Sequence, residues 1–509
     1  MPEPSLRRAG AIVLGLTICA KLAGFIREAV VAGTFGTTRT VDLYLAAVIV
    51  PAIVTNVLYQ GLPNAFVPLF TSSHIATKVR RLAISLIVIS VGIAGLMWFL
   101  APWAASLTSG GFPDDLRPEI AALVRIGSLA ILAAMIEALA RSRLIARKRF
   151  AQSGIGPLWS SLTIILLVVF FADAGAHVLM WGFVLGTAAM ALWNLLPFER
   201  RPEDTVAVAM DDVTAPSSWV LVVLTVTTAG LLYGLIDRHL GSFLPEGSLA
   251  ALQYANTVAS QPVAICGVAL SMAVFPYLAQ RIASGDRNGA TALLERAGQW
   301  ALLGVVPSTV FTVFYGPELM RILLERGQFG AESRLLSGGV LAVYGLWMLP
   351  TVLGSVVAKL HYSTRGVRAL LWATFVGLSL KAGVSIWFVG VFGIAGLAGS
   401  SVVAVVGYVF VLAIMLPGWC SHAIWRAWLK STAVLGAIAL IGSLAGFAAR
   451  SIITLPSGKL DAYVPLAIAV GICGALLLLA GPRLGVPELR MLASHAMAFL
   501  HSRGNRRTG

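Results

Sequence analysis

Residues 20–36 read Ala20-Lys-Leu-Ala-Gly-Phe-Ile-Arg-Glu-Ala-Val-Val-Ala-Gly-Thr-Phe-Gly36. This stretch places three charged residues, Lys21, Arg27 and Glu28, inside an otherwise apolar span near the N-terminus. An ionised side chain at the centre of a bilayer costs roughly 3 kcal/mol on insertion scales. Such a charge is usually retained where it faces a polar cavity, so the stretch predicts a membrane protein with a charged interior. A charged interior in turn predicts a charged solute.

The composition of the whole chain supports a membrane location. The chain has 509 residues, of which 58% are hydrophobic and 12% charged, whereas soluble proteins carry about 25% charged residues. Its net charge of +15 is spread over short basic clusters between apolar spans, which argues against a nucleic-acid partner. The four cysteines are far apart and lack metal-ligand spacing, so we expect neither a disulfide framework nor a metal or other cofactor.

The apolar runs predict an all-α polytopic membrane protein with 14 transmembrane helices. Basic residues concentrate on one side of these spans, which predicts that both termini are cytoplasmic. The expected spans are 9–35, 41–71, 82–108, 118–141, 152–173, 176–198, 216–243, 248–280, 290–316, 334–361, 368–390, 392–417, 428–450 and 461–481.

A weak internal repeat divides the spans. Ala65-Phe-Val-Pro68 near the end of span 2 matches Ala273-Val-Phe-Pro276 near the end of span 8, six spans later. Six is an even number, so the two six-helix lobes have the same orientation and are related by a pseudo-two-fold axis along the membrane normal, with a site between them. We expect an N-lobe at 1–200, a cytoplasmic linker at 201–215, a C-lobe at 216–420, spans 13–14 at 421–485 and a basic cytoplasmic tail at 486–509.

The charges of span 1 lie on one helix face. Gly24, Arg27 and Glu28 are spaced i, i+3 and i+4, and Lys21 lies about two turns before Glu28 on the same side. One interpretation is an Arg27–Glu28 ion pair that only fixes packing. The other is a cationic cavity wall on which Glu28 orients Arg27, and we prefer it because a structural pair alone does not explain Lys21.

Span 2 contributes polar residues at both ends. Asp42 follows the start of the span, where it can cap the helix N-terminus, line a cavity, or do both. Gln60 and Asn64 flank Gly61 and Pro63, a pattern typical of a broken helix beside a cavity.

Three further charges are candidates for coupling transport to a driving force. Asp237 and Arg238 come late in span 7, where an interfacial pair is the simpler interpretation. Lys381 stands alone in span 11, too central for its ammonium to reach the interface comfortably, and Asp237 is its hypothesised buried partner.

Other polar residues have simpler expected roles. Span 8 carries a polar stripe that includes Asn256 and is long enough to line a path. Glu137 and Arg141 in span 4 are spaced i, i+4, which favours a helix-end ion pair over a site. A phosphate-binding Gly-Lys-Ser/Thr loop and a catalytic set in a long outer loop are both missing from the sequence, so we expect a transporter and not an enzyme.

Several motifs together resemble the MurJ/MviN family of lipid II flippases. The resemblance covers most of the chain, and it implies the multidrug/oligosaccharidyl-lipid/polysaccharide exporter fold, with alternating access, a cationic central cavity for the headgroup diphosphate, and a lipid-tail groove at spans 13 and 14. The motifs are Lys21-Leu-Ala-Gly-Phe-Ile-Arg-Glu28, Gly61-Leu-Pro-Asn-Ala-Phe-Val-Pro68, Ser242-Phe-Leu-Pro-Glu-Gly-Ser248, Leu324-Glu-Arg-Gly-Gln-Phe329 and Gly393-Ile-Ala-Gly-Leu-Ala398.

Residue by residue, the resemblance assigns Arg27 and Asp42 to family positions and places Lys21 where the family usually has arginine. Departures occur where the family tends to have cavity charges, which implies a less cationic cavity here. These positions read Thr55, Asn56, Gln60, Asn256 and Thr257. If Lys381 occupies the place where related proteins bind a cation, its ammonium replaces that ion by a fixed charge.

The expected function is therefore a flippase in a bacterial inner membrane. It moves lipid II or a related polyprenyl-diphosphate glycan to the outer leaflet for peptidoglycan or surface polysaccharide synthesis. The expected partners are that lipid-linked precursor and membrane lipids, with glycan synthesis enzymes as an open further class. Two alternatives remain, which are a non-transporting scaffold of a glycan synthesis complex and a small-molecule antiporter on the same fold.

Overall fold

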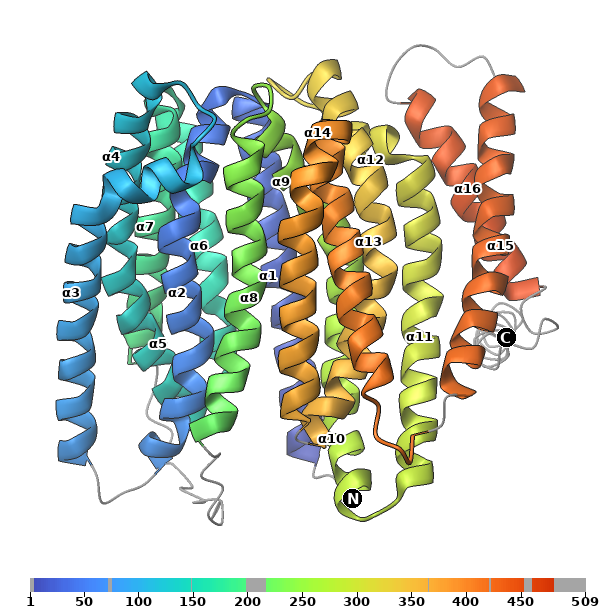
Figure 1. The fold of residues 1–509 in the computed structure, drawn as a ribbon, viewed down its shortest axis with the longest axis horizontal. Coiled ribbons are helices and arrows are strands. Elements are labelled where there is room, and N and C mark those ends of the chain that lie inside the picture. Colours follow the sequence, from blue (N-terminus) through green and yellow to red (C-terminus); the bar gives the residue numbers. More distant parts are fainter. Residues whose placement is uncertain are drawn as a thin grey trace, which may run out of the picture. The chain divides into compact units, whose positions relative to one another are not determined.

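The computed structural model describes residues 4–71, 76–147, 149–197, 217–364, 366–420, 423–452 and 460–479. Helices account for all regular secondary structure within these ranges (Figure 1). The predicted linker at 201–215 and the predicted tail at 486–509 lie outside the described residues. An all-helical chain was expected because long apolar runs must satisfy their backbone hydrogen bonds internally.

The chain folds into two compact units. The first unit comprises residues 1–254, 326–333 and 381–397, and the second comprises 255–325, 334–380 and 398–509. The helices that begin in the first unit are α1 (Pro4–Phe35), α2 (Arg39–Thr71), α3 (Ala76–Thr108), η2 (Asp114–Leu116), α4 (Arg117–Ser128), α5 (Ala130–Ala146), α6 (Phe150–Phe171), η3 (Ala172–Ala174), α7 (Ala176–Leu195), α8 (Ser217–Gly241) and α9 (Ser248–Val263). Within this unit α2 packs against α5 and α8, and α6 packs against α1 and α7.

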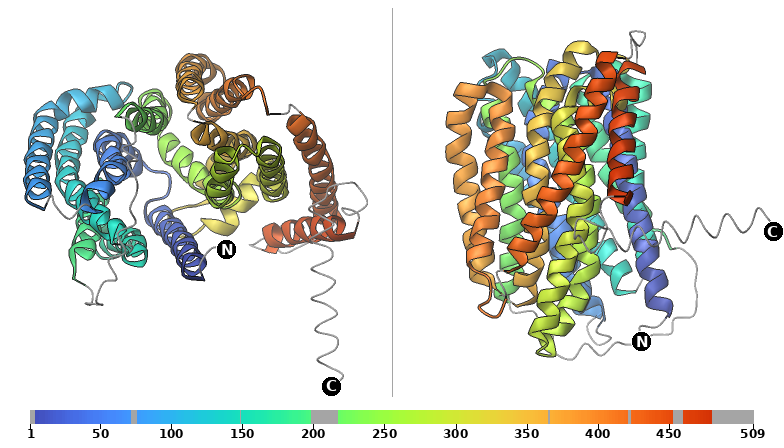
Figure 2. Two further views of the ribbon diagram at one scale, coloured as in Figure 1. Left: turned by 90° about the horizontal axis from the view of Figure 1, so that it is seen from below. Right: turned by 90° about the vertical axis from the view of Figure 1, so that its right-hand side faces the viewer.

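The second unit is helical in the same way. Within it α15 packs against α11 and α16, and Figure 2 shows α15 and α16 side by side. The helices that begin here are η4 (Ala264–Ala269), α10 (Leu270–Ala283), α11 (Arg287–Phe314), α12 (Gly316–Leu323), α14 (Val367–Ile414), α15 (Ala423–Ile452) and α16 (Leu460–Leu479). Helix α13 (Ala331–Ser363) begins in the last residues of the first unit, and most of its length belongs to the second.

Ten segments among the described residues are long and apolar enough to cross a membrane. The side chains of the most apolar segments are largely exposed, as in Arg81–Thr108, where 11% of the most apolar stretch is buried. Phe99 and Trp103 on α3 are 80% and 66% exposed. A face of this kind is stable against lipid tails and unstable against water, so the chain is a multi-pass membrane protein.

Helix α14 is two helices joined by a reversal at Gly393. Gly393 has φ +55°, outside the helical region. Lys381 donates to the carbonyl of Leu397 at 3.0 Å, whereas sixteen residues of straight helix would separate these positions by about 24 Å. The chain therefore doubles back at Gly393, and the two predicted spans 368–390 and 392–417 form a helical hairpin.

The expected break in span 2 is wrong. Helix α2 runs without interruption from Arg39 to Thr71, through the Gly61–Pro63 segment. The irregular turn lies instead in the repeat-related span, where Pro262 is followed by the π-helix η4. A π-turn widens the helix and leaves backbone groups poorly paired, and such turns are frequent at functional sites.

Candidate functional site

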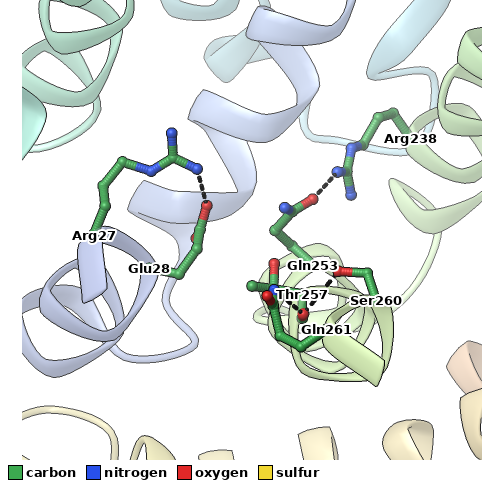
Figure 3. A network of polar contacts seen from close by, with 7 residues as sticks. All are labelled: Arg27, Glu28, Arg238, Gln253, Thr257, Ser260 and Gln261. Carbon is green, nitrogen blue, oxygen red and sulfur yellow. Dashed lines mark hydrogen bonds and ion pairs between the residues drawn. The ribbon is translucent and has the colours of Figure 1, made fainter. Parts of the chain in front are cut away.

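The expected Arg27–Glu28 ion pair is present on α1. Arg27 Nη2 lies 2.7 Å from Glu28 Oε1, and the two side chains are 31% and 14% exposed (Figure 3). Because the pair is partly open, the guanidinium keeps donors that Glu28 does not use. The contact confirms the pair, while its substrate-binding role stays a prediction.

The rest of the α1 face is also open. Lys21 is exposed, and a Cβ built on Gly24 meets no atom within 4 Å. Open space beside Gly24 agrees with the expectation that something can approach α1 closely there. The structure therefore brings Arg27 and Glu28 into contact and leaves Lys21 and Gly24 on accessible surface.

Arg238 and Asp237 are neighbours near the end of α8, where the sequence favoured an interfacial pair. Their side chains take different partners, and both residues are buried, at 9% and 8% exposure. Arg238 Nη2 donates to Gln253 Oε1 on α9 at 2.7 Å (Figure 3). Adjacent residues on a helix point about 100° apart, so two neighbouring charges readily face different helices.

Asp237 instead pairs with Lys381, which confirms the hypothesised contact. Lys381 Nζ lies 2.5 Å from Asp237 Oδ1 and 3.0 Å from the carbonyl oxygen of Leu397. The Lys381 side chain is 0% exposed. A sealed ammonium needs such partners because an unpaired charge in a low-dielectric interior is strongly destabilising. The pair joins α8 to the hairpin of α14.

Asp42 caps a helix, but not its own. Its two carboxylate oxygens accept from the backbone amides of Gly247 at 2.7 Å and Ala250 at 2.9 Å. These amides belong to the entry and first turn of α9, where a carboxylate also complements the helix dipole. Asp42 is 1% exposed, so its geometry favours the cap over the open-wall role.

Glycines hold the α1–α2 connection against two other loops, and we call Gly33, Gly36, Gly247 and Gly327 the glycine junction. Gly36, Gly247 and Gly327 have positive φ, and a Cβ on each would collide with a backbone carbonyl oxygen. The amide of Gln328 donates to the Gly33 carbonyl at 2.8 Å. Only glycine permits both this backbone conformation and such close approach.

The expected Glu137–Arg141 helix-end pair is wrong. Glu137 is 1% exposed and its Oε2 accepts from Asn194 Nδ2 on α7 at 2.8 Å. The guanidinium of Arg141 lies 4.1 Å from the ring centroid of Tyr59 on α2. Correct i, i+4 spacing makes an ion pair possible, but neighbouring helices offered each side chain another partner.

The remaining predicted site residues are Gln60, Asn64 and Asn256. The side chains of Gln60 and Asn64 lie outside the described residues. Asn256 is exposed on the part of α9 that belongs to the second unit. Its neighbours Ser260 and Gln261 hydrogen-bond the α9 carbonyl of Thr257 (Figure 3).

Sequence reasoning missed Lys359 on α13. Its ammonium lies 5.6 Å from the ring centroid of Phe275 and 5.5 Å from that of Tyr362. A lysine within the apolar span 334–361 was a sufficient signal, since the same argument singled out Lys381. Its aromatic partners were not readable, because Phe275 is more than eighty residues away in the sequence.

Comparisons with known proteins agree with this architecture. A family model described as "Lipid II flippase MurJ" matches residues 31–460. A probable lipid II flippase MurJ of Rhizobium meliloti is 26% identical over 408 residues, covering 75% of each chain. Another from Thermotoga maritima is 24% identical over 454 residues, covering 87% of this chain and 92% of the relative.

The fold has solved counterparts. A structure titled "Lipid II flippase MurJ, inward closed conformation" superposes with a TM-score of 0.75 at 19% identity, covering 91% of this chain and 97% of that one. An inward-facing multidrug resistance MATE family transporter of the MOP superfamily gives 0.58 at 13% identity, covering 83% and 98%. Since the family model spans well over half of the sequence, the chain belongs to the MurJ lipid II flippase family.

Proposed function

We propose that this protein carries a lipid-linked glycan, with lipid II as the leading candidate, from the cytoplasmic to the outer leaflet of a bacterial inner membrane. Family membership supports the transport class, which is not an enzyme class. The main observation in support of this binding site is that the guanidinium of Arg27 on α1 is paired with Glu28 and also partly exposed. A cation that is paired on one side and open on the other is suited to a diphosphate.

Each charge on α1 has a distinct proposed role. Arg27 binds the headgroup diphosphate with the donors that Glu28 leaves open, and Glu28 fixes the guanidinium orientation. Lys21, seven residues before Glu28, supplies a second positive charge. Gly24 lets the headgroup approach the helix, since no atom lies within 4 Å of its Cβ position. Asp42 shapes the site indirectly by holding the start of α9.

The helix inventory supports the proposal of 14 spans. Ten apolar segments are present, and the α14 segment is a hairpin of two helices. Three charged helical segments, α1, α8 and the continuous α9–η4–α10, have the length to cross as well. We place spans 1–6 and 7–12 in two lobes that alternate access, assign α15 and α16 to the lipid tail, and place both termini in the cytoplasm with glycan synthesis enzymes as membrane partners.

The Lys381–Asp237 pair supports a proposal about the driving force. A carboxylate and a backbone carbonyl around one positive charge resemble the ligand set of a bound monovalent cation, with the Lys381 ammonium in the ion's place. The sequence has no ATP-binding loop, which leaves the membrane potential, an ion gradient or downstream consumption of the product as energy sources. A fixed charge in place of a bound ion favours the membrane potential, worth about 2.3 kcal/mol per charge per 100 mV, as the proposed source. Transport is then independent of sodium.

The decisive experiment replaces Arg27 in cells that depend on this protein. We expect Arg27→Ala to cause accumulation of polyprenyl-diphosphate glycans on the cytoplasmic side, at normal abundance of the protein in the membrane. The matched control is Arg281→Ala, because Arg281 also forms an ion pair at 2.8 Å, with Asp286, but both side chains are 48% exposed. Mass spectrometry of the lipid-linked intermediates after depletion also identifies the glycan.

A scaffold role is the second candidate, and one observation favours it. Thr55 and Asn56, at positions where the family tends to have arginine, hydrogen-bond the Ala52 carbonyl of their own helix. Normal glycan export by Arg27→Ala would support the scaffold and overturn the transport proposal. An antiporter for small cations would need an acidic site, whereas the open face of α1 carries Lys21 and Arg27.

A further inference from the structure

Glu137 is a buried carboxyl group that the proposed transport site does not use. It lies on α5 in the first unit and is 1% exposed. Its Oε2 accepts from Asn194 Nδ2 at 2.8 Å, while its Oε1 is buried and has no hydrogen-bond partner. The Oδ1 of Asn194 is likewise buried and without a partner. Two acceptors of one hydrogen-bonded pair thus lack a donor.

A proton on Glu137 supplies that missing donor. A carboxylic acid and a primary amide form a cyclic pair in which the acid carbonyl accepts from the amide NH₂ and the acid O–H donates to the amide oxygen. The first of these bonds is already present, between Glu137 and Asn194. Protonation also removes a buried negative charge, which is strongly disfavoured when no cation contacts it.

Arg141 offers the ionised form of Glu137 an alternative partner. It is four residues later on the same face of α5, and its guanidinium currently stacks on Tyr59 of α2. The Nε atom of Arg141 is buried without a hydrogen-bond partner, so the side chain has capacity for another contact. Glu137 and Arg141 are therefore close neighbours on α5, but Glu137 contacts Asn194 and Arg141 contacts Tyr59.

Among the described residues, the charged and titratable groups that act on Glu137 are Arg141 of α5 and Tyr59 of α2, and α7 contributes the neutral Asn194. Gly156 of α6 lies against the Asn194 amide, and α3 packs apolar side chains on the adjacent turns of α5. Burial acts on Glu137 in either arrangement, so what differs between its two protonation states is the choice of partner, Asn194 or Arg141.

We propose that Glu137 is a proton-binding site, neutral when paired with Asn194 and ionised when paired with Arg141. Loss of the proton draws Arg141 from the Tyr59 ring and so weakens a contact between α5 and α2, whereas proton binding restores it. No covalent step is involved, and the proton exchanges with water. The site does not involve Arg27, so its function does not depend on the identity of the glycan.

Infrared spectroscopy of the full-length protein in lipid nanodiscs tests the proposal directly. We expect a protonated-carboxyl C=O band at neutral pH that disappears in Glu137→Gln. The matched control Glu332→Gln removes an exposed carboxyl and should leave the band unchanged. A wild-type protein without the band, or a band that survives in Glu137→Gln, overturns the proposal.

A second variant keeps the test valid if Glu137→Gln folds poorly. In Arg141→Gln the acid remains but its alternative partner is lost, so the band should persist to higher pH, by about one pH unit or more. An unchanged pH range would show that Arg141 does not stabilise the ionised form, which contradicts the proposed exchange of partners. Both measurements are independent of transport activity, so the outcome does not depend on the proposed flippase function.

Discussion

Two ion pairs of the first unit show what burial does to a charge in a membrane helix. Arg27 and Glu28 are adjacent on α1, 2.7 Å apart, and 31% and 14% exposed. Asp237 and Lys381 come from sequence positions 144 residues apart and lie 2.5 Å apart, and their side chains are 12% and 0% exposed. The open pair keeps donors for a ligand, whereas the sealed pair joins helices. Exposure, more than the presence of opposite charges, therefore separates a candidate binding site from a structural charge.

The largest effect on stability should follow from breaking the sealed pair. Lys381→Met leaves the Asp237 carboxylate buried without its cation, which we expect to destabilise the protein by about 3–5 kcal/mol. Thermal unfolding of the purified protein measures the loss. Adding Asp237→Asn to Lys381→Met should recover most of it, and so should exchange of the two charges in Asp237→Lys with Lys381→Asp. A double variant as unstable as the single one would show that the pair is not the cause.

Asp42 extends the comparison to a buried carboxylate that is held by backbone amides and not by a cationic side chain. Asp42 is sealed like Lys381, but two backbone amides hold it. We expect Asp42→Ala to destabilise the protein by about 2 kcal/mol, the upper range for a helix cap, because the α9 amides lose their acceptor. Asp42→Asn should be milder because its amide oxygen still accepts a hydrogen bond. Equal losses for the two variants would indicate that the negative charge, and not the cap, matters.

The open pair should contribute little to stability. We expect Arg27→Ala to change the free energy of unfolding by less than about 1 kcal/mol, because a part-exposed pair is screened. Transport should nevertheless fall at least tenfold, with Arg27→Lys retaining part of it because lysine keeps the charge without the guanidinium fork. Unfolding and glycan export, measured on the same variants, check both statements. A large loss of stability in Arg27→Ala would show that the Arg27–Glu28 pair is structural, like the Asp237–Lys381 pair, and would contradict the comparison.

The smallest effect is expected from sodium. If the Lys381 ammonium stands in for a bound cation, replacing sodium by choline in a vesicle assay should leave wild-type transport unchanged. Lys381→Ala, in contrast, leaves Asp237 and the Leu397 carbonyl available to an ion, so any residual transport should respond to sodium. Sodium-dependent transport by the wild-type protein would contradict the fixed-charge proposal.

The sequence was sufficient to predict the features that follow from the free-energy cost of placing a charged side chain in an apolar segment. A lysine in the middle of an apolar span needs a partner for its charge, so Lys381 pointed to a buried partner, and Asp237 is that partner. The same argument located the open charges of α1, because few other reasons keep Arg27 at that depth. Apolar length likewise predicted the helices, including the two that form the α14 hairpin.

Features that depend on competition between neighbours were not predictable. Arg141 has the right spacing for Glu137, but the ring of Tyr59 on α2 and the amide of Asn194 on α7 took the two side chains. Asp42 sits at a helix start, yet the amides it meets belong to α9. Spacing along one helix determines which residues share a face, and it contains no information about which other helix covers that face.

The distance in sequence between Asp237 and Lys381 has a consequence for biosynthesis. The ribosome makes α8 first, and 144 residues must follow before the lysine exists. At about 5–20 residues per second, this interval is on the order of ten seconds. During that time the carboxyl group of Asp237 must stay protonated, or α8 must remain in the polar environment of the insertion machinery. Final placement of α8 is therefore a late event of assembly, completed when the α14 hairpin inserts and Lys381 pairs with Asp237.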